Sequence, residues 1–331
     1  MDDEVQEVIE QVTRRKLSYA RVLLRGSKLP YSGNRDQIRD RLMEAVKANK
    51  ISLAILKDLL NELDVWGNQR IRLCRLPAEV LAEYQTEESV LKKAEEAGMG
   101  VLMGGEVALV PPLELMPMAI SYEEQHGQRW LKLFAAKTRK VFEYQPNVPE
   151  HEHDDHPGVV FKPFKLESQK AVSFAEINLA SGMSLFSTTL LRRGTAYHAE
   201  FEEFFAVFEP LIPLHRADPI PLFEANRGIC GLPSAVVRLV SRRARTSTGG
   251  KLEARSHSAK TDMRTDVELE TYFPSGSDTM GLHCNCVWEP SEELDEPLHT
   301  HVYAPQAEIS IPAQSTEANV RHVLHRILEL N

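Results

Sequence analysis

Residues 29–42 read LPYSGNRDQIRDRL, a glycine-containing turn that opens directly into an amphipathic helix. Asn34 is expected to cap this helix, with Gln37 three residues later in the capping-box position. Ile38 begins the apolar stripe of the helix, and Gly33 permits a backbone conformation that other residues resist. Because the first amides of a helix have no intrahelical acceptor, the turn offers N–H donors and the positive end of the helix dipole to an anion.

Apolar residues at helical spacing predict further helices on both sides of this turn. We expect one helix over residues 4–16, a second over 17–26 that Gly26 ends, and another that Ser52 caps. The buried side of this last helix is expected to be Ile55, Leu56, Leu59, Leu60 and Leu63. Together with the helix after the turn, these elements make residues 1–76 a small all-helical domain.

The remainder of the chain predicts an α+β domain with an antiparallel sheet. Residues 77–127 are expected to connect the helical domain to this second domain, 128–331, and to contain a helix over 86–97. Strands are expected at 130–134, 141–144, 172–179, 183–191, 267–273 and 282–288. Helices are expected around Phe201, Phe204, Phe205 and Phe208, which share one helical face, and from Ser315 to the C-terminus.

Two polar stretches of this domain lack the pattern of regular structure. Residues 145–158 contain three prolines and predict a surface loop. Residues 241–264 are rich in Arg, Ser, Thr and Gly and predict a flexible basic loop. The absence of aromatic residues from that loop argues against stacking on single-stranded bases and favours contact with a phosphate backbone.

The 331-residue chain has a formal net charge of −9 and 42% hydrophobic residues, an ordinary globular composition. The charge is segregated along the sequence. Residues 11–50 hold 11 Lys/Arg against 3 Asp/Glu, and residues 238–264 hold 8 against 2, whereas residues 265–331 hold 2 against 12. Because local patches decide where a polyanion docks, the two basic segments are the candidate binding surfaces.

Four cysteines in a chain of this length do not suggest a disulfide framework. The acidic start, Met1 to Glu4, lacks the apolar stretch of a signal peptide, and no apolar run approaches the roughly 20 residues that cross a bilayer. We therefore expect a protein that is not secreted, works in a cytoplasmic, nucleoid or nuclear compartment, and does not engage a membrane.

The turn resembles the SAP family of small helical DNA-binding modules over residues 20–48. The residues that match its pattern are Leu29, Pro30, Ser32, Gly33, Arg35, Ile38, Arg41 and Leu42. The resemblance implies sequence-tolerant binding of duplex DNA, with the turn and the following helix against the phosphate backbone.

The layout of the chain also resembles the CENP-N kinetochore family, which has an N-terminal multi-helix domain followed by a mixed domain. The closest local match is the stretch VELETYFPSG at residues 267–276, and residues 51–66 match the helix that ends the helical domain. This resemblance implies a groove that grips nucleosomal DNA and partner subunits, without catalysis.

Three other clusters contain residue types that occur in catalytic or metal sites. The run His151 to His156 carries imidazoles and carboxylates, the donors that zinc or manganese prefers, but a solvated acidic loop explains it as well. Cys284 and Cys286 fall on the apolar face of an expected strand, where cysteine behaves as a small hydrophobe. Cys230 has no histidine partner that the sequence identifies, and P-loop, dinucleotide-binding and metalloprotease motifs are absent.

These observations favour a non-enzymatic, DNA-binding adaptor without cofactor or metal, which docks protein partners or a second copy through its C-terminal domain. The phenylalanine-rich helix and the acidic C-terminal segment are candidate protein-facing elements. The residues expected to contact nucleic acid are Lys28, Ser32, Gly33, Asn34, Arg35, Arg39, Arg242, Arg243, Arg245 and Lys251. The alternatives are a metal-dependent hydrolase or nuclease subunit that uses the His151–His156 cluster, and a protein-interaction scaffold that binds no nucleic acid.

Overall fold

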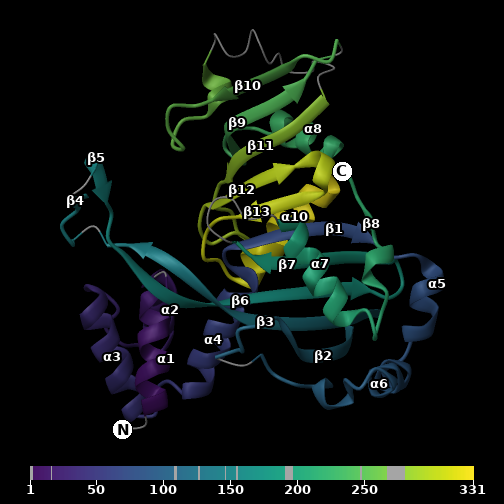
Figure 1. Cartoon of the computed structure of the whole chain (residues 1–331), viewed down its shortest axis with the longest axis horizontal. Helices are drawn as coiled ribbons and strands as arrows, with labels where there is room; N and C mark the ends of the chain where they lie inside the picture. Colours follow the sequence, from purple (N-terminus) through teal and green to yellow (C-terminus); the bar gives the residue numbers. More distant parts are fainter. Residues whose placement is uncertain are drawn as a thin grey trace. The chain divides into compact units, whose positions relative to one another are not determined.

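A computed structural model describes the chain as an α+β protein, with N-terminal helices, antiparallel strands and a C-terminal helix (Figure 1). The residues described are 3–15, 17–107, 110–125, 127–145, 147–153, 156–190, 197–246, 248–266 and 280–331. The chain divides into two compact units. The first consists of Met1–Cys74, Thr189–Thr195 and Asp218–Asn331, and the second of Arg75–Thr188 and Ala196–Ala217.

The N-terminal helices of the first unit begin and end close to where their sequence signals predict. They are α1 (Asp3–Arg14), α2 (Leu17–Gly26), α3 (Arg35–Lys47) and α4 (Leu53–Trp66). The predicted capping box of α3 is confirmed, because the Asn34 side chain accepts from the Gln37 amide and the Gln37 side chain accepts from the Asn34 amide. Ser52 caps α4 through the amide of Ile55, as expected.

The apolar faces of α1, α3 and α4 meet in a buried core. Its most buried members include Ile9 from α1, Leu42 from α3 and Leu60 from α4. The expected buried face of α4 is wrong at Ile55, which is 47% exposed. The buried stripe of α4 runs through Leu56, Leu60 and Leu63, and Ile55 lies beside this stripe on the exposed side of the helix.

Six strands of the first unit form an antiparallel array in the order β10-β9-β11-β12-β13-β1. Their bounds are β1 (Gln69–Arg75), β9 (Val237–Arg245), β10 (Lys251–Arg255), β11 (Met280–Trp288), β12 (Leu298–Tyr303) and β13 (Glu308–Ile311), and a short β8 (Asp218–Pro219) pairs with β1. Helix α8 (Phe223–Gly231) packs on β11, and helix α10 (Glu317–Glu329) packs on α8 and β12.

The expectation that residues 1–76 are wholly helical is wrong, because their last residues form strand β1. Ile71 and Leu73 of this strand are buried, and the strand pairs in register with β13, more than 200 residues later. The contact-defined units accordingly differ from the expected division into 1–76, 77–127 and 128–331.

The second unit contains four long strands in the order β7-β6-β3-β2. Its strands are β2 (Met116–Gln125), β3 (Gln128–Tyr144), β4 (His151–His153), β5 (His156–Phe161), β6 (Phe164–Asn178) and β7 (Met183–Thr189), and its helices are α5 (Ala78–Leu81), α6 (Glu87–Glu96) and α7 (Tyr197–Phe208). Single-turn helices occur in the chain at Ala82–Tyr84, Gly100–Leu102, Leu214–Arg216, Met263–Thr265 and Ala304–Gln306.

Three expectations for this unit change. The strands predicted at 130–134 and 141–144 are parts of the single strand β3, and the predicted loop 145–158 contains β4 and the start of β5. The four phenylalanines of α7 are all buried, so they form core and do not face a partner. The capped helix α6 and the β6–β7 hairpin are confirmed.

The predicted flexible loop at 241–264 is also wrong. Its residues form the end of β9, all of β10 and a helical turn. The charged side chains alternate with Ala244 and Ala254, which are buried, so the segment carries a strand period that its basic composition conceals. The strand expected at 267–273 lies outside the described residues, as does the stretch 267–276 that resembles the CENP-N family.

Candidate nucleic-acid interface

Helix α2 ends in a left-handed residue that is not glycine. Lys28 has φ 57°, its amide donates to Arg25 O at 2.9 Å, and the amide of Leu29 donates to Leu24 O at 2.8 Å. This pair of bonds is the Schellman arrangement, in which the left-handed position usually belongs to glycine. Gly26 is the last residue of α2, as expected, and lies two residues before this left-handed position. The exposed Lys28 ammonium group is thus held at the start of the turn at some conformational cost.

Gly33 has the conformation that the sequence predicted. Its φ is 128°, and a Cβ atom there would lie 2.4 Å from Oε1 of Gln37, the oxygen that completes the capping box. The same capping box changes the expected set of anion-binding amides. The amides of Asn34 and Gln37 already donate within the capping box, and the amide of Ile38 donates to Asn34 O. The amides of Arg35 and Asp36 are therefore the ones that can donate to an anion at the helix start.

Two arginines hold the turn from the side of the neighbouring helices. Arg21 donates to the carbonyl oxygen of Gly33 at 2.9 Å, and Arg41 donates to the carbonyl oxygen of Ser32. Arg25 stacks over the ring of Tyr31 with its guanidinium carbon 4.4 Å from the ring centroid. These guanidinium groups therefore both fix the turn and add positive charge beside it; the role of Arg41 was not predicted.

The cations of the turn differ in how much of their charge remains available. Lys28 and Arg35 are exposed, and no ion pair of either is described. Arg39 lies 3.2 Å from Asp36 and 3.7 Å from Asp40, so its charge is partly offset by two carboxylates. Of the predicted residues in this region, Lys28, Ser32, Gly33, Asn34 and Arg35 form one exposed surface, residues 28–35, which we call the turn surface.

The other residues expected to contact nucleic acid lie on the β9–β10 hairpin, and they differ in exposure and in ion pairing. Arg242 is buried and points to the face of β9 opposite that of Arg243, so it is removed from any backbone-contacting surface. Arg243 forms an ion pair with Glu253 at 2.7 Å. Arg245 and Lys251 are both exposed and directly opposite each other at the end of the hairpin. Like charges in this position repel, so an anion bound between them would relieve the repulsion.

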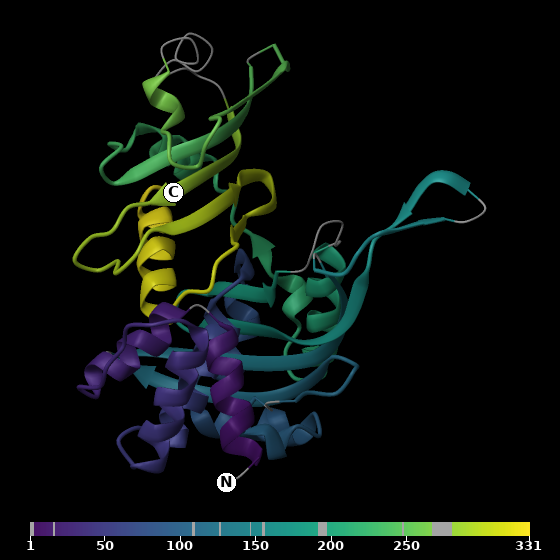
Figure 2. The ribbon, with the colours of Figure 1, turned by 90° about the vertical axis from the view of Figure 1, so that its left-hand side faces the viewer.

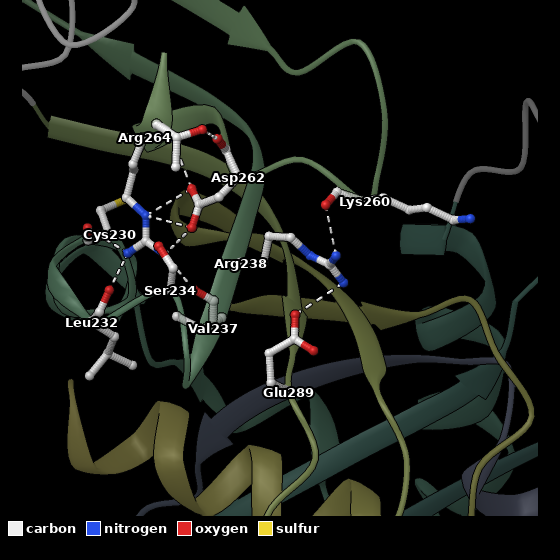
Figure 3. A network of polar contacts seen from close by, with 10 residues as sticks. Cys230, Leu232, Ser234, Val237, Arg238, Lys260, Asp262, Arg264 and Glu289 are labelled. Carbon is white, nitrogen blue, oxygen red and sulfur yellow. Dashed lines mark hydrogen bonds and ion pairs between the residues drawn. The ribbon is translucent and has the colours of Figure 1, made fainter. Parts of the chain in front are cut away.

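Figure 3 shows how two other arginines of the basic segment, Arg264 and Arg238, are held by neighbouring groups of the protein. Arg264 donates to the carbonyl oxygens of Leu232 and Val237 and to the carboxylate of Asp262. Burial alone would raise the pKa of Asp262, but hydrogen bonds from Arg264 and Ser234 lower it below its ordinary value. Arg264 thus anchors the segment after β10 to the end of α8 and the start of β9.

Arg238, the other labelled arginine of Figure 3, is held in the same way. It donates to Lys260 O at 2.9 Å and pairs with Glu289 at 3.0 Å. Much of the basic segment is therefore structural. Besides its hairpin end, Arg255 and Lys260 are also exposed, and no ion pair of either is described. No described interaction joins that hairpin end to the turn surface.

Strands β11 and β12 carry a histidine cluster that was not predicted, on the face opposite to that of Cys284 and Cys286. The rings of His283 and His301 stack at 5.8 Å, and Tyr303 lies 4.7 Å from His283. Burial lowers the pKa of His283 to about 4 and that of His301 to about 3, with nearby cations adding to the effect. These imidazoles are therefore neutral at pH 7. The alternation His299-Thr-His301 was the available signal in the sequence.

The His151–His156 run and the cysteines do not form a catalytic or metal site among the described residues. Among the residues that the structure describes, no group of three or more His, Cys, Asp or Glu side chains is placed to hold a metal ion, although Asp154 and Asp155 lie outside that part. Cys284 and Cys286 are buried, as expected, and the hydrogen bond from the Cys284 thiol to Cys286, together with burial, raises the pKa of Cys284. Burial likewise raises the pKa of Cys230, which disfavours a nucleophilic thiolate.

Comparison with known proteins does not assign the chain to a family: no family model matches it, and no curated protein matches it. Within the described residues, none of the helices has the length and apolar character that a membrane span requires.

Proposed function

We propose that this protein is a non-enzymatic adaptor that binds duplex DNA through the phosphate backbone and docks protein partners through its α+β part. The observation that carries the proposal is the turn surface, where an exposed helix start meets Lys28 and Arg35. Amides at a helix N-terminus and nearby cations are the groups that bind phosphate. The resemblances to SAP modules and to the CENP-N family support the same function.

The chemistry of the turn surface favours binding with little sequence specificity. Its donors are backbone amides, an ammonium and a guanidinium group, which suit phosphate oxygens, whereas base readout needs side chains that enter a groove. Asp36 lies in the first turn of α3, where it is paired with Arg39, and Asp40 lies in the second, so both carboxylates disfavour a polyanion that runs along the helix. The proposed contact is therefore with the tip of the helix and the turn, and not with its length.

A salt titration of duplex DNA tests the proposal. Fluorescence anisotropy with labelled 30-base-pair duplexes of several sequences should show binding at low salt that weakens steeply toward physiological salt, because each phosphate contact releases counterions. The variant Arg35→Glu with Arg39→Glu should weaken binding to all sequences alike and keep the thermal stability. A matched control is Lys92→Glu with Arg227→Glu, the same charge change at two exposed positions on other helices, α6 and α8.

No binding at low salt would show that the DNA function is wrong. An equal loss in the control variant would show that net charge, and not the turn surface, governs the interaction. A loss that depends on the DNA sequence would replace backbone contact with base readout.

A further inference from the structure

Two rows of polar side chains cross one face of the strands of the first unit. Residues directly opposite each other on antiparallel strands share a face, so the registers of neighbouring strands define each row. From β10 to β1, the first row is Arg255, Ser241, Asn285, His301, Ser310 and Arg70. The second row runs beside it and contains, in the same direction, Arg243, His283, Tyr303 and Glu308. We call these two rows the polar face; strands β9 to β13 are the green to yellow strands in Figure 2.

Rings gather at the centre of the polar face. The ring centroid of His283 lies 4.7 Å from that of Tyr303 and 5.8 Å from that of His301. His299, two residues before His301 on β12, shares this face and forms a hydrogen bond with Asn285. For His283, His301 and Tyr303, in contrast, no side-chain hydrogen bond is described, and Nε2 of His283 is buried without a partner in the described part of the chain. The centre of the face therefore holds polar groups whose hydrogen-bonding capacity the described residues do not use.

Arg255 adds an available cation to the same row. Its side chain is exposed, and neither an ion pair nor a hydrogen bond of it is described. Ser241 and Asn285, which separate it from His301 along the row, are short and leave room for the longer arginine side chain to reach toward His301. The charge of Arg255 acts on that imidazole: burial, the neighbouring histidines and the charges of Arg70 and Arg255 together lower the pKa of His301 to about 3.

The carboxylates of the polar face are already bound by arginines. Glu308 lies 2.6 Å from Arg70 and 2.7 Å from Arg72. Glu253 lies 2.7 Å from Arg243, which it faces across the β9–β10 pair. The charged and titratable groups on the polar face around His301 are thus Arg70 from β1, Arg243 from β9, Arg255 from β10, His283 from β11, His299 and Tyr303 from β12, and Glu308 from β13. The charges that act on His301 from Arg70 and Arg255 are both positive, and they disfavour a proton there.

These groups suit a tetrahedral oxyanion. Arg255, the two neutral imidazoles of His283 and His301, and the Tyr303 hydroxyl offer donors from three strands, which the oxygens of a tetrahedral anion match better than the planar pair of a carboxylate. A doubly charged anion also fits the positive field. A metal ion would be repelled by the same arginines, and no group of three or more potential ligands is placed to hold one among the described residues.

We propose that the polar face binds a small, doubly charged oxyanion of the phosphate class between Arg255 and the rings of His301 and Tyr303. This site is distinct from the turn surface and does not depend on DNA binding. A bound anion reverses the sign of the field at His301, so binding is accompanied by the uptake of a proton by the protein.

A sulfate titration of the full chain, followed by NMR of carbon-13-labelled histidine side chains, tests the site. Sulfate is a suitable probe because it stays doubly charged over the pH range of the experiment, so a proton taken up belongs to the protein. Sulfate should produce saturable shifts of the His283 and His301 signals and raise the pKa of His301 by about 1–3, whereas chloride at equal ionic strength should not. The His301 signal is assigned as the one that His301→Gln removes.

Two variants separate the charge from the proton. Arg255→Gln should weaken sulfate binding about tenfold or more, because it removes the exposed guanidinium group. The matched control, Arg227→Gln, makes the same change at an exposed position of helix α8 and should bind sulfate as wild type does. His301→Gln should keep part of the affinity but remove its increase on acidification, a result that a merely structural role of this imidazole would not produce.

Three results would overturn the proposal: shifts that do not saturate with sulfate, an equal loss of affinity in Arg227→Gln, or zinc binding at the same histidines that sulfate does not weaken. Duplex-DNA anisotropy on Arg255→Gln distinguishes a small oxyanion from the phosphates of DNA. Kept DNA binding supports the separate site, and lost DNA binding would make the polar face part of the DNA surface. Sulfate binding in a protein that binds no DNA would leave this site standing and remove the proposed function.

Discussion

Replacing Lys28 with glycine is expected to stabilise the protein while it weakens DNA binding. Lys28 occupies the left-handed position after α2 with φ 57°, where a side chain with a Cβ atom costs about 1–2 kcal/mol that glycine avoids. Glycine loses more backbone entropy on folding, which offsets part of this gain. The net expectation is a rise of about 0.5–1 kcal/mol in the free energy of unfolding.

Two further variants separate the backbone from the charge. Asn49 has φ 54° and closes α3 with the same pair of bonds, from Asn49 N–H to Val46 O and from Lys50 N–H to Ala45 O. Because asparagine tolerates the left-handed region, Asn49→Gly should gain less than Lys28→Gly, about 0.3 kcal/mol. Lys28→Ala keeps the strained conformation but removes the ammonium group, so its stability should stay within about 0.5 kcal/mol of wild type.

The effect on DNA follows from the charge alone. Both Lys28 variants remove one phosphate contact, so the slope of log K against log salt should fall in magnitude by about 0.9. Lys28→Gly and Lys28→Ala should therefore bind DNA equally weakly although their stabilities differ. Asn49→Gly should bind as wild type does.

Urea unfolding followed by circular dichroism and DNA anisotropy over a salt series measure the two quantities. A destabilised Lys28→Gly protein would refute the assignment of strain to this residue. A stabilised variant with unchanged DNA binding would keep the strain argument and remove Lys28 from the interface.

Two other predictions concern stability. Gly33→Ala should lower the free energy of unfolding in urea by about 2–4 kcal/mol, because it forces an unfavourable φ and displaces the capping Gln37 side chain. Gly98→Ala, at φ 71° with nothing within 4 Å of the added Cβ, should lower it by only about 1 kcal/mol. Equal losses in the two variants would contradict the role of the capping box. The pKa of His283 is about 4 and that of His301 about 3 in the folded protein, against about 6.5 in the unfolded chain. The unfolded chain therefore binds protons first as pH falls. The urea concentration at the unfolding midpoint should accordingly fall from pH 7 toward pH 4 and level off near the pKa values of the folded protein. His301→Gln should flatten this dependence, and a midpoint that rises on acidification would exclude the buried neutral state of these imidazoles.

Local sequence signals determined the helices of the N-terminal part, their caps and the glycine turn. The capping box of α3 could be predicted because the groups that form it lie within four residues of each other. The same holds for the β6–β7 hairpin and for the existence of the strand at 282–288, although residues 284–288 of β11 are all buried and do not alternate as predicted. The positions of Lys28 and Arg35 beside the turn follow from the same short stretch.

Only the tertiary structure decided which cations remain available and how the sheet is assembled. Strand β1 pairs with β13, which lies more than 200 residues later in the sequence. A local sequence pattern does not identify the distant strand with which β1 pairs or the register of that pairing. Arg264 and Arg238 look like solvated charges in the sequence, but they are anchored by carbonyl oxygens and carboxylates from other elements. Strand β3 was predicted as two separate strands, at 130–134 and 141–144, because charged residues interrupt the apolar pattern between them; Lys137 and Arg139 are paired there with Glu200 of α7, a partner far away in the sequence. The turn surface could therefore be located from the sequence, whereas its surroundings depend on contacts between residues far apart in the chain.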